Sequence, residues 1–104
     1  MKRTTAALLS LSVLTAPIAP AVAANVQQGE TLAKRWCATC HVVSADQQQG
    51  STTAPAFSEI AKKPGLTAAS IALFLLDPHP PMPDMNLTRN EAANLAAYIK
   101  SQER

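Results

Sequence analysis

Cys37-Ala38-Thr39-Cys40-His41 is the stretch of this 104-residue sequence that decides its fold. Two thiols three residues apart lie on one side of a helical turn, so each can bond to one of the two vinyl groups at a porphyrin edge. The imidazole of His41 is then placed over the iron. The pattern C-x-x-C-H is typical of covalent haem attachment, and the chain has no other cysteine. The motif therefore predicts one covalently bound haem c, attached through Cys37 and Cys40 and ligated by His41.

The same cysteines are open to two other interpretations. Trp36 before Cys37 and Cys40 also gives the W-C-x-x-C pattern of thioredoxin-like thiol–disulfide oxidoreductases. That pattern follows a β-strand in an α/β domain, and no strand pattern precedes it here. A structural zinc site needs about four ligands. The two cysteines with His41 and His79 supply that number, but the histidines are far apart and His79 lies in a proline cluster. Haem is favoured, with the oxidoreductase as the alternative.

Residues 1–24 have the features of a secretory signal peptide. Lys2 and Arg3 give a charged start, residues 6–14 an apolar core, and Ala21-Val22-Ala23 an A-x-A cleavage signal. A membrane anchor needs about 20 apolar residues, and serine, threonine and proline interrupt this run earlier. We expect cleavage after Ala23 or Ala24, a periplasmic location, and no membrane span in the mature chain.

The mature chain is short and has balanced charge. Removal of 24 residues leaves 80 of the 104, which is one domain over residues 25–104. A chain this short usually needs a stabilising element besides its hydrophobic core, and a covalently bound haem would supply one. Lys2 and Arg3 account for the formal net charge of +2, so the mature part balances seven basic against seven acidic residues. This balance argues against nucleic acid as a partner.

The periodicity of the mature chain predicts about four helices and no strand. Apolar residues at helical spacing predict helices over about 26–39, 56–63 and 67–76, and from residue 88 onward. Residues 42–55 read as a loop that wraps the haem edge. In the first helix, Trp36 is expected to pack inside, and Gly29 lies either in a frayed turn or where another helix approaches closely. The residues expected to face inward are Leu32, Ala33 and Cys40 in the first helix, Phe57, Ile60 and Ala61 in the second, Ile71, Phe74 and Leu75 in the third, and Ala92, Leu95, Ala96 and Ile99 in the last.

The segment over residues 78–83 offers a second ligand for the iron. It contains four prolines in six residues, so it presents its side chains with little further entropy to lose. Met82, held extended by Pro83, is the preferred ligand. His79 and Met85 are the alternatives, the first expected to point to solvent and the second to pack under Leu87.

Together these residues resemble the small class I cytochromes c of bacteria. The resemblance covers the mature chain: Cys37, Cys40 and His41 match the attachment motif, Met82-Pro83 the sixth-ligand loop, and residues 95–99 the terminal helix. It implies a small all-α cytochrome c fold, about four helices around one covalently bound haem, with His41 and Met82 as axial ligands. It also implies that Gly29 and Tyr98 lie where the first and last helices cross. The carbonyl of Pro55 would accept a hydrogen bond from the His41 ring, although the family usually has glycine where this chain has Ala54.

The function implied by the resemblance is that of a periplasmic single-electron carrier. A six-coordinate iron has no open position for substrate, so the chain is expected not to be an enzyme. Its partners would be a redox donor and a redox acceptor, docked transiently to a monomer. The remaining alternative is a dedicated haem subunit of a larger redox complex.

Overall fold

A computed structural model of the protein describes residues 12–19, 22–47, 54–78 and 80–103. Within these ranges it contains four α-helices: α1 (Val26–Leu32), α2 (Phe57–Ala61), α3 (Ala68–Leu76) and α4 (Arg89–Ser101). A π-helical segment, η1 (Ala33–Cys37), continues α1. None of the described residues forms a β-strand. The predicted all-α fold of about four helices is confirmed.

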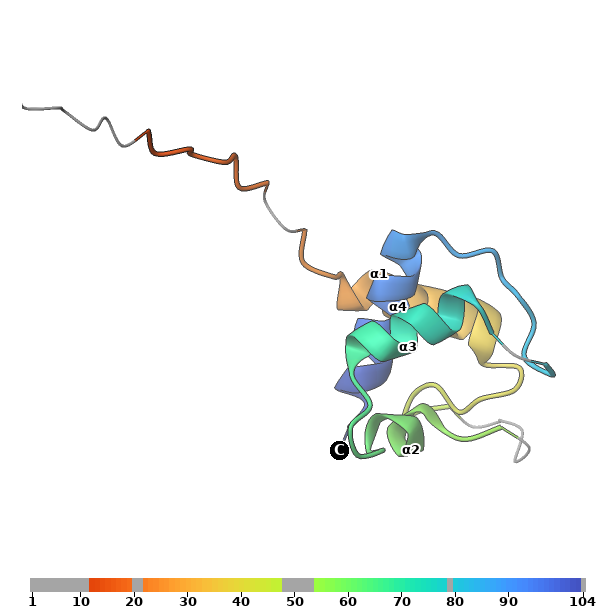
Figure 1. The fold of residues 1–104 in the computed structure, drawn as a ribbon. Coiled ribbons are helices and arrows are strands. Elements are labelled where there is room, and N and C mark those ends of the chain that lie inside the picture. Colours follow the sequence, from red (N-terminus) through yellow and green to blue (C-terminus); the bar gives the residue numbers. More distant parts are fainter. Residues whose placement is uncertain (1–11, 20–21, 48–53, 79, 104) are drawn as a thin grey trace, which may run out of the picture.

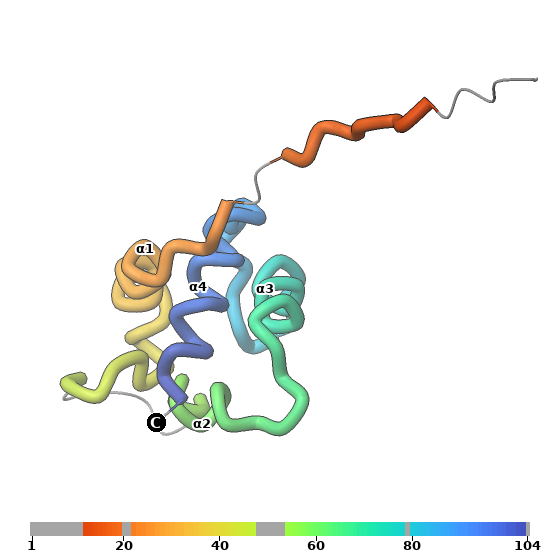
Figure 2. Tube along the Cα trace, turned by 90° about the vertical axis from the view of Figure 1, so that its left-hand side faces the viewer, coloured from red at the N-terminus to blue at the C-terminus, as the bar shows by residue number. Residues whose placement is uncertain are grey.

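α4 is the helix on which the others pack. α1, α2 and α3 all contact it. Figure 2 shows α1 and α3 on either side of α4, and both views show α2 near the C-terminal end of α4 (Figures 1 and 2). Residues 12–19 and 22–24 are exposed, have no secondary structure and extend away from the helices (Figure 1). In the part of the chain that the structure describes, no helix has the length and apolar character needed to cross a lipid bilayer.

α4 begins where the sequence predicts, after residue 88, at a capping box formed by Thr88 and Glu91. Thr88 Oγ1 accepts a hydrogen bond from Glu91 N (3.2 Å), and Glu91 Oε2 accepts one from Thr88 N (2.8 Å). The backbone N–H of Thr88, followed by its hydroxyl, lowers the pKa of the Glu91 carboxyl because both donate to the charged form. The buried side of α4 contains the predicted Ala92, Leu95, Ala96 and Ile99, together with Asn94 and Tyr98. The periodicity thus identifies the core face, but it gives no sign of the buried amide.

The crossing of α1 and α4 requires a glycine. A Cβ atom on Gly29 would overlap the backbone carbonyl oxygen of Asn94 and lie 2.8 Å from the Cβ of Tyr98. Asn94 also fixes the start of α1, because its Oδ1 accepts a hydrogen bond from Asn25 N (2.7 Å) and its Nδ2 donates one to Gln28 Oε1 (3.0 Å). Gly29 is therefore at a close helix approach and not in a frayed turn.

The π-helical segment changes which residues of the first helix are buried. Ala38 N donates to Ala33 O (3.1 Å), an i to i+5 bond that widens the turn and rotates the later side chains. Cys37 is buried, whereas Trp36 is 50% exposed and Cys40 is exposed. The prediction of one regular helix to about residue 39, with Trp36 packed inside, is therefore wrong at its C-terminal end.

α2 is shorter than predicted, but it buries the expected side chains. It ends at Ala61, and Phe57 and Ala61 are buried while Ile60 packs against the core. Lys100 Nζ from α4 donates a hydrogen bond to the carbonyl oxygen of Ala61 (2.8 Å). This bond ties the C-terminal end of α2 to α4.

α3 buries a narrower face than the sequence predicts. Thr67 caps its N-terminus, since Thr67 Oγ1 accepts a hydrogen bond from Ser70 N (3.1 Å). Ile71 and Leu75 are buried as predicted, but Phe74 is 41% exposed, so the prediction of its burial is wrong. The helix packs mainly on α4. α3 therefore buries only a narrow stripe of its own side chains, with i, i+4 spacing, against α4. Phe74 lies at the edge of that stripe.

We predict that Gly29→Ala destabilises the folded protein. The added methyl group meets the backbone at Asn94, and overpacking against backbone costs up to about 3 kcal/mol. The gain in helix propensity offsets roughly 1 kcal/mol of this. Denaturant unfolding followed by far-ultraviolet circular dichroism should show a net loss of about 2 kcal/mol. Gln27→Ala, at an exposed position of the same helix, should stay within about 0.5 kcal/mol of the wild type. A Gly29→Ala protein as stable as the wild type would contradict the close crossing.

Candidate functional site

The two cysteines and His41 lie in one turn at the end of η1. Cys40 N and His41 N both donate hydrogen bonds to the carbonyl oxygen of Cys37, at 3.1 and 2.8 Å. Cys37 is only 5% exposed, and Cys40 is exposed. The turn therefore brings the three residues of the motif together, with one thiol inside the fold and the other at the surface.

The His41 imidazole is held by the segment that precedes α2. Its Nδ1 lies 2.6 Å from the backbone carbonyl oxygen of Pro55. Its ring centroid lies 5.4 Å from that of Phe57, with the two rings tilted by 49°. A backbone carbonyl only accepts hydrogen bonds, so Nδ1 carries the proton, and in the neutral ring Nε2 is the nitrogen with the lone pair. The structure thus leaves Nε2 as the His41 atom that can bind a metal.

The chain that follows His41 is held by residues from α2 and α4. Phe57 N donates a hydrogen bond to Val42 O (3.0 Å). The hydroxyl of Tyr98, from α4, donates one to Val43 O (2.8 Å). These contacts pair backbone groups of a segment that forms neither helix nor strand. The resemblance implied that Tyr98 lies at the helix crossing, but the hydrogen bond from its hydroxyl was not predicted.

Gln47 also contacts this segment, and sequence reasoning missed it. Its Oε1 accepts a hydrogen bond from Val43 N (2.9 Å), and its Nε2 donates to His41 O (3.0 Å) and Ala38 O (3.2 Å). A glutamine in a polar run has no spacing that distinguishes it from its neighbours. The described residues of the predicted loop, 42–47 and 54–55, form neither helix nor strand, as expected, and residues 48–53 lie outside the described residues.

The three side chains considered for the second axial position differ in their surroundings. Met82 is half-buried and packs against the hydrophobic core. Met85 is half-buried too, but it is not among the described residues that pack against that core. His79 lies outside the described residues. Of the two methionines, the structure gives Met82 the closer association with the folded domain.

The environment of the first cysteine does not suit thiol–disulfide exchange. Burial, and then the neighbouring Cys40, raise the pKa of the Cys37 thiol to about 11. A thioredoxin-like nucleophile must be a thiolate near neutral pH, which requires a lowered pKa. Residues 26–36, directly before Cys37, are helical, and no described residue before Cys37 forms a strand. The oxidoreductase alternative therefore loses both the electrostatic and the structural features on which it depends.

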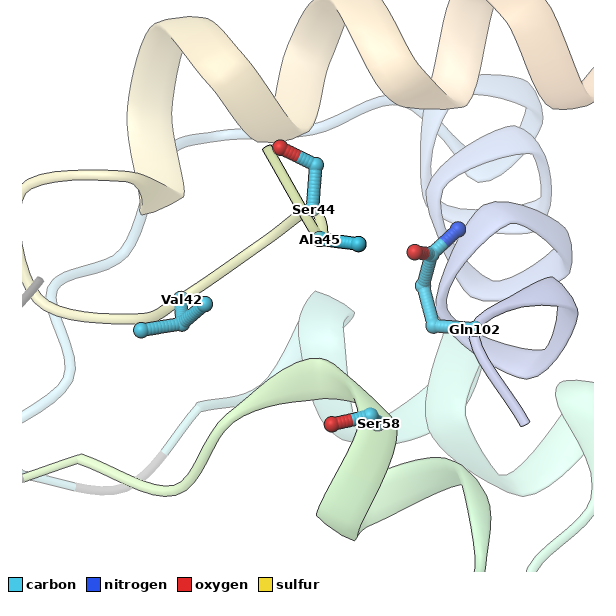
Figure 3. Close-up of a pocket in the computed structure, with 5 residues that line it drawn as sticks. All are labelled: Val42, Ser44, Ala45, Ser58 and Gln102. Carbon is cyan, nitrogen blue, oxygen red and sulfur yellow. The ribbon is translucent and has the colours of Figure 1, made fainter. Parts of the chain in front are cut away.

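The described residues contain no metal-binding cluster, and the pocket beside the motif is small. No group of three or more His, Cys, Asp or Glu side chains among them could hold a metal ion. A pocket of about 140 Å³ lies between the chain after His41, α2 and the end of α4 (Figure 3). This volume is below the range of about 300–1,000 Å³ that is usual for ligand pockets. Its lining, Val42, Ser44, Ala45, Ser58 and Gln102, contains none of the predicted haem residues.

The donor set of the turn and the proline-rich loop suits a haem. Thiols for two thioether bonds, an imidazole with a free Nε2 and a core-packed methionine are the groups that hold haem c in cytochromes with His/Met ligation. The His41 ring is oriented by the hydrogen bond that its Nδ1 donates to the Pro55 carbonyl, as is usual for metal-bound histidines. The residues present therefore fit the cofactor that the motif predicts.

Comparison with known proteins identifies the family. The sequence profile of the family described as cytochrome c oxidase, cbb3-type, subunit III matches residues 24–99. The chain belongs to the cytochrome c family. This cytochrome c is also similar to cytochrome c-552 of Bradyrhizobium diazoefficiens, with 49% identity over 81 residues, which is 78% of each chain. No solved structure matches it. The predictions of a small class I cytochrome c, of covalently bound haem c and of a haem-containing electron carrier are confirmed.

Proposed function

We propose that this cytochrome c is a periplasmic single-electron carrier whose haem is attached through Cys37 and Cys40 and ligated by His41 and Met82. The observation that carries the proposal is the 2.6 Å contact between His41 Nδ1 and the Pro55 carbonyl, directly beside the C-x-x-C-H turn. It fixes the tautomer that binds iron through Nε2, in a chain that belongs to the cytochrome c family.

Each of these residues has a separate task. The thiols of Cys37 and Cys40 tether the cofactor, which makes it part of the covalent chain. The Pro55 carbonyl orients the His41 ring and makes Nε2 a stronger donor. The Met82 thioether is a soft ligand that favours ferrous iron, so a positive reduction potential is expected. The haem, when bound, supplies a one-electron redox couple.

Electron transfer without bond-making chemistry follows from the same ligand set. With His41 and Met82 on the two sides of the iron, no open coordination position is left for a substrate. A donor and an acceptor would then dock one after the other on a small, transient interface. We propose a monomeric carrier on this basis.

A dedicated haem subunit is the second candidate function. The description of the matching family profile, which names a subunit of cbb3-type cytochrome c oxidase, favours it. Tagged protein purified from its native cells separates the two functions. A carrier is recovered as a single red species of monomer mass, whereas a subunit is recovered with stoichiometric partner chains.

Export and cleavage of residues 1–24 are part of the proposal. The family match begins at residue 24, and α1 begins at Val26 with Asn25 as its N-cap. Residues 22–24 are exposed and have no secondary structure, so cleavage after Ala23 or Ala24 removes no part of a helix.

The cysteines are tested by serine substitution. Cys37→Ser and Cys40→Ser should each sharply reduce covalent haem, and the double variant should abolish it, because each thiol makes one of the two bonds. Denaturing gels stained for haem peroxidase activity measure this directly. Met82→Ala serves as the control, since it should keep its covalent haem. Wild-type staining of the double variant would refute the attachment site.

The sixth ligand is tested by a pair of methionine variants. Met82→Ala should remove the long-wavelength absorption band of ferric thioether ligation and lower the reduction potential, because the ligand that favours ferrous iron is lost. Met85→Ala is the matched control and should keep both properties. The opposite result, with the band lost only in Met85→Ala, would transfer the role to Met85.

Processing is tested by the mass of the exported protein. Holoprotein from a periplasmic extract should have the mass of residues 24–104 or 25–104 plus one haem. Deletion of residues 2–24 should leave the chain in the cytoplasm without covalent haem. A red protein that retains residues 1–24 would argue for an uncleaved anchor instead.

A further inference from the structure

The Gln47 side chain brackets the backbone on both sides of His41. Its Nε2 donates to the carbonyl oxygens of Ala38 (3.2 Å) and His41 (3.0 Å), and its Oε1 accepts from the backbone N–H of Val43 (2.9 Å). A carboxamide has two N–H donors and one carbonyl acceptor. Gln47 thus joins the middle of the C-x-x-C-H turn, its last residue and the chain that leaves it.

These backbone groups have few other ways to be paired. The chain from residue 41 to residue 43 forms neither helix nor strand, and Val43 is only 1% exposed. Buried backbone groups outside regular structure need side-chain or solvent partners. Tyr98 OH pairs the Val43 carbonyl, and Gln47 pairs the N–H of the same residue.

We propose that Gln47 is a positioning residue for the proximal haem ligand. By fixing the backbone before and after His41, it holds the imidazole in the orientation in which Nδ1 reaches the Pro55 carbonyl (2.6 Å). That hydrogen bond sets how strongly Nε2 donates to iron. Gln47 would therefore affect the reduction potential of the iron without binding to it. This inference rests on the proposed role of His41 as an axial ligand.

A residue that only stabilises the loop would behave differently. Loss of its hydrogen bonds would lower the stability of the protein but leave the folded haem site unchanged. Thr88→Ala, which removes the N-cap side chain of α4, is a suitable comparison. It deletes the hydrogen bond that Thr88 Oγ1 accepts from Glu91 N and the one that it donates to Glu91 Oε2, but in an exposed cap.

The experiment compares Gln47→Leu with Gln27→Leu and Thr88→Ala in the haem-loaded protein. Gln27 is exposed on α1 and provides the same chemical change away from His41. In Gln47→Leu the reduction potential should move to more positive values, because a looser Nδ1 hydrogen bond makes the imidazole a weaker donor to ferric iron. The hyperfine-shifted proton resonances of the His41 ring should move as well. Both controls should keep the wild-type potential and resonances. A Gln47→Leu protein that is less stable, but keeps the wild-type reduction potential and His41 ring resonances, would overturn the proposal.

A measurement on the wild type covers the case in which Gln47→Leu yields no holoprotein. The two Nε2 protons of Gln47 should exchange slowly with solvent in both oxidation states, unlike those of exposed Gln27. Equally fast exchange would overturn the positioning role. Failure of the proposed function is distinguishable, since a protein in which His41 is not the ligand shows no hyperfine shift of the His41 ring protons already in the wild type.

Discussion

The close approach of the backbones of α1 and α4 is the constraint on which the rest of this fold depends. A domain of this size buries little apolar surface, and the absence of a Cβ at Gly29 lets α1 lie directly against the carbonyl of Asn94. The buried Asn94 amide then pairs with Asn25 and Gln28 at the start of α1. A shift of either helix would break these hydrogen bonds inside the fold, where unpaired polar groups are costly. The crossing therefore fixes both the distance and the register of the two helices.

Once α4 is in place, the polar ends of its side chains hold the chain that forms the site. Tyr98 OH binds the carbonyl of Val43, and Lys100 Nζ binds that of Ala61. These two carbonyls lie on either side of residues 44–60 in the sequence, the segment that contains Pro55. The contact between His41 and Pro55 thus depends on α4 through the hydrogen bonds that this helix makes to Val43 and Ala61. Side chains replace the strand pairing that a larger domain would use for such a segment.

Features determined by local chemistry could be predicted from the sequence, and features determined by tertiary context could not. The capping box of Thr88 and Glu91 starts α4 where the pattern indicates, and the C-x-x-C-H spacing identifies the cofactor. The exposure of Trp36 was missed because a π turn depends on one backbone hydrogen bond that leaves no mark on hydrophobic periodicity. Phe74 has helical spacing suited to burial, but its neighbour α4 covers only a narrow stripe of α3. Gln47 acquires its partners only when the chain folds back on the turn.

The position of Trp36 directly before Cys37 has a spectroscopic consequence. It is the one tryptophan of the chain, and its side chain is half exposed. The Cζ atom of Arg35 lies 5.0 Å from the centroid of its ring. Adjacent Cα atoms are about 3.8 Å apart in any state of the chain. With Cys37 bonded to the porphyrin as proposed, the indole stays next to the haem whether the protein is folded or unfolded. Energy transfer then quenches its emission in both states. Tryptophan fluorescence in this protein therefore reports on whether the cofactor has been attached. Its intensity in the holoprotein changes little on unfolding.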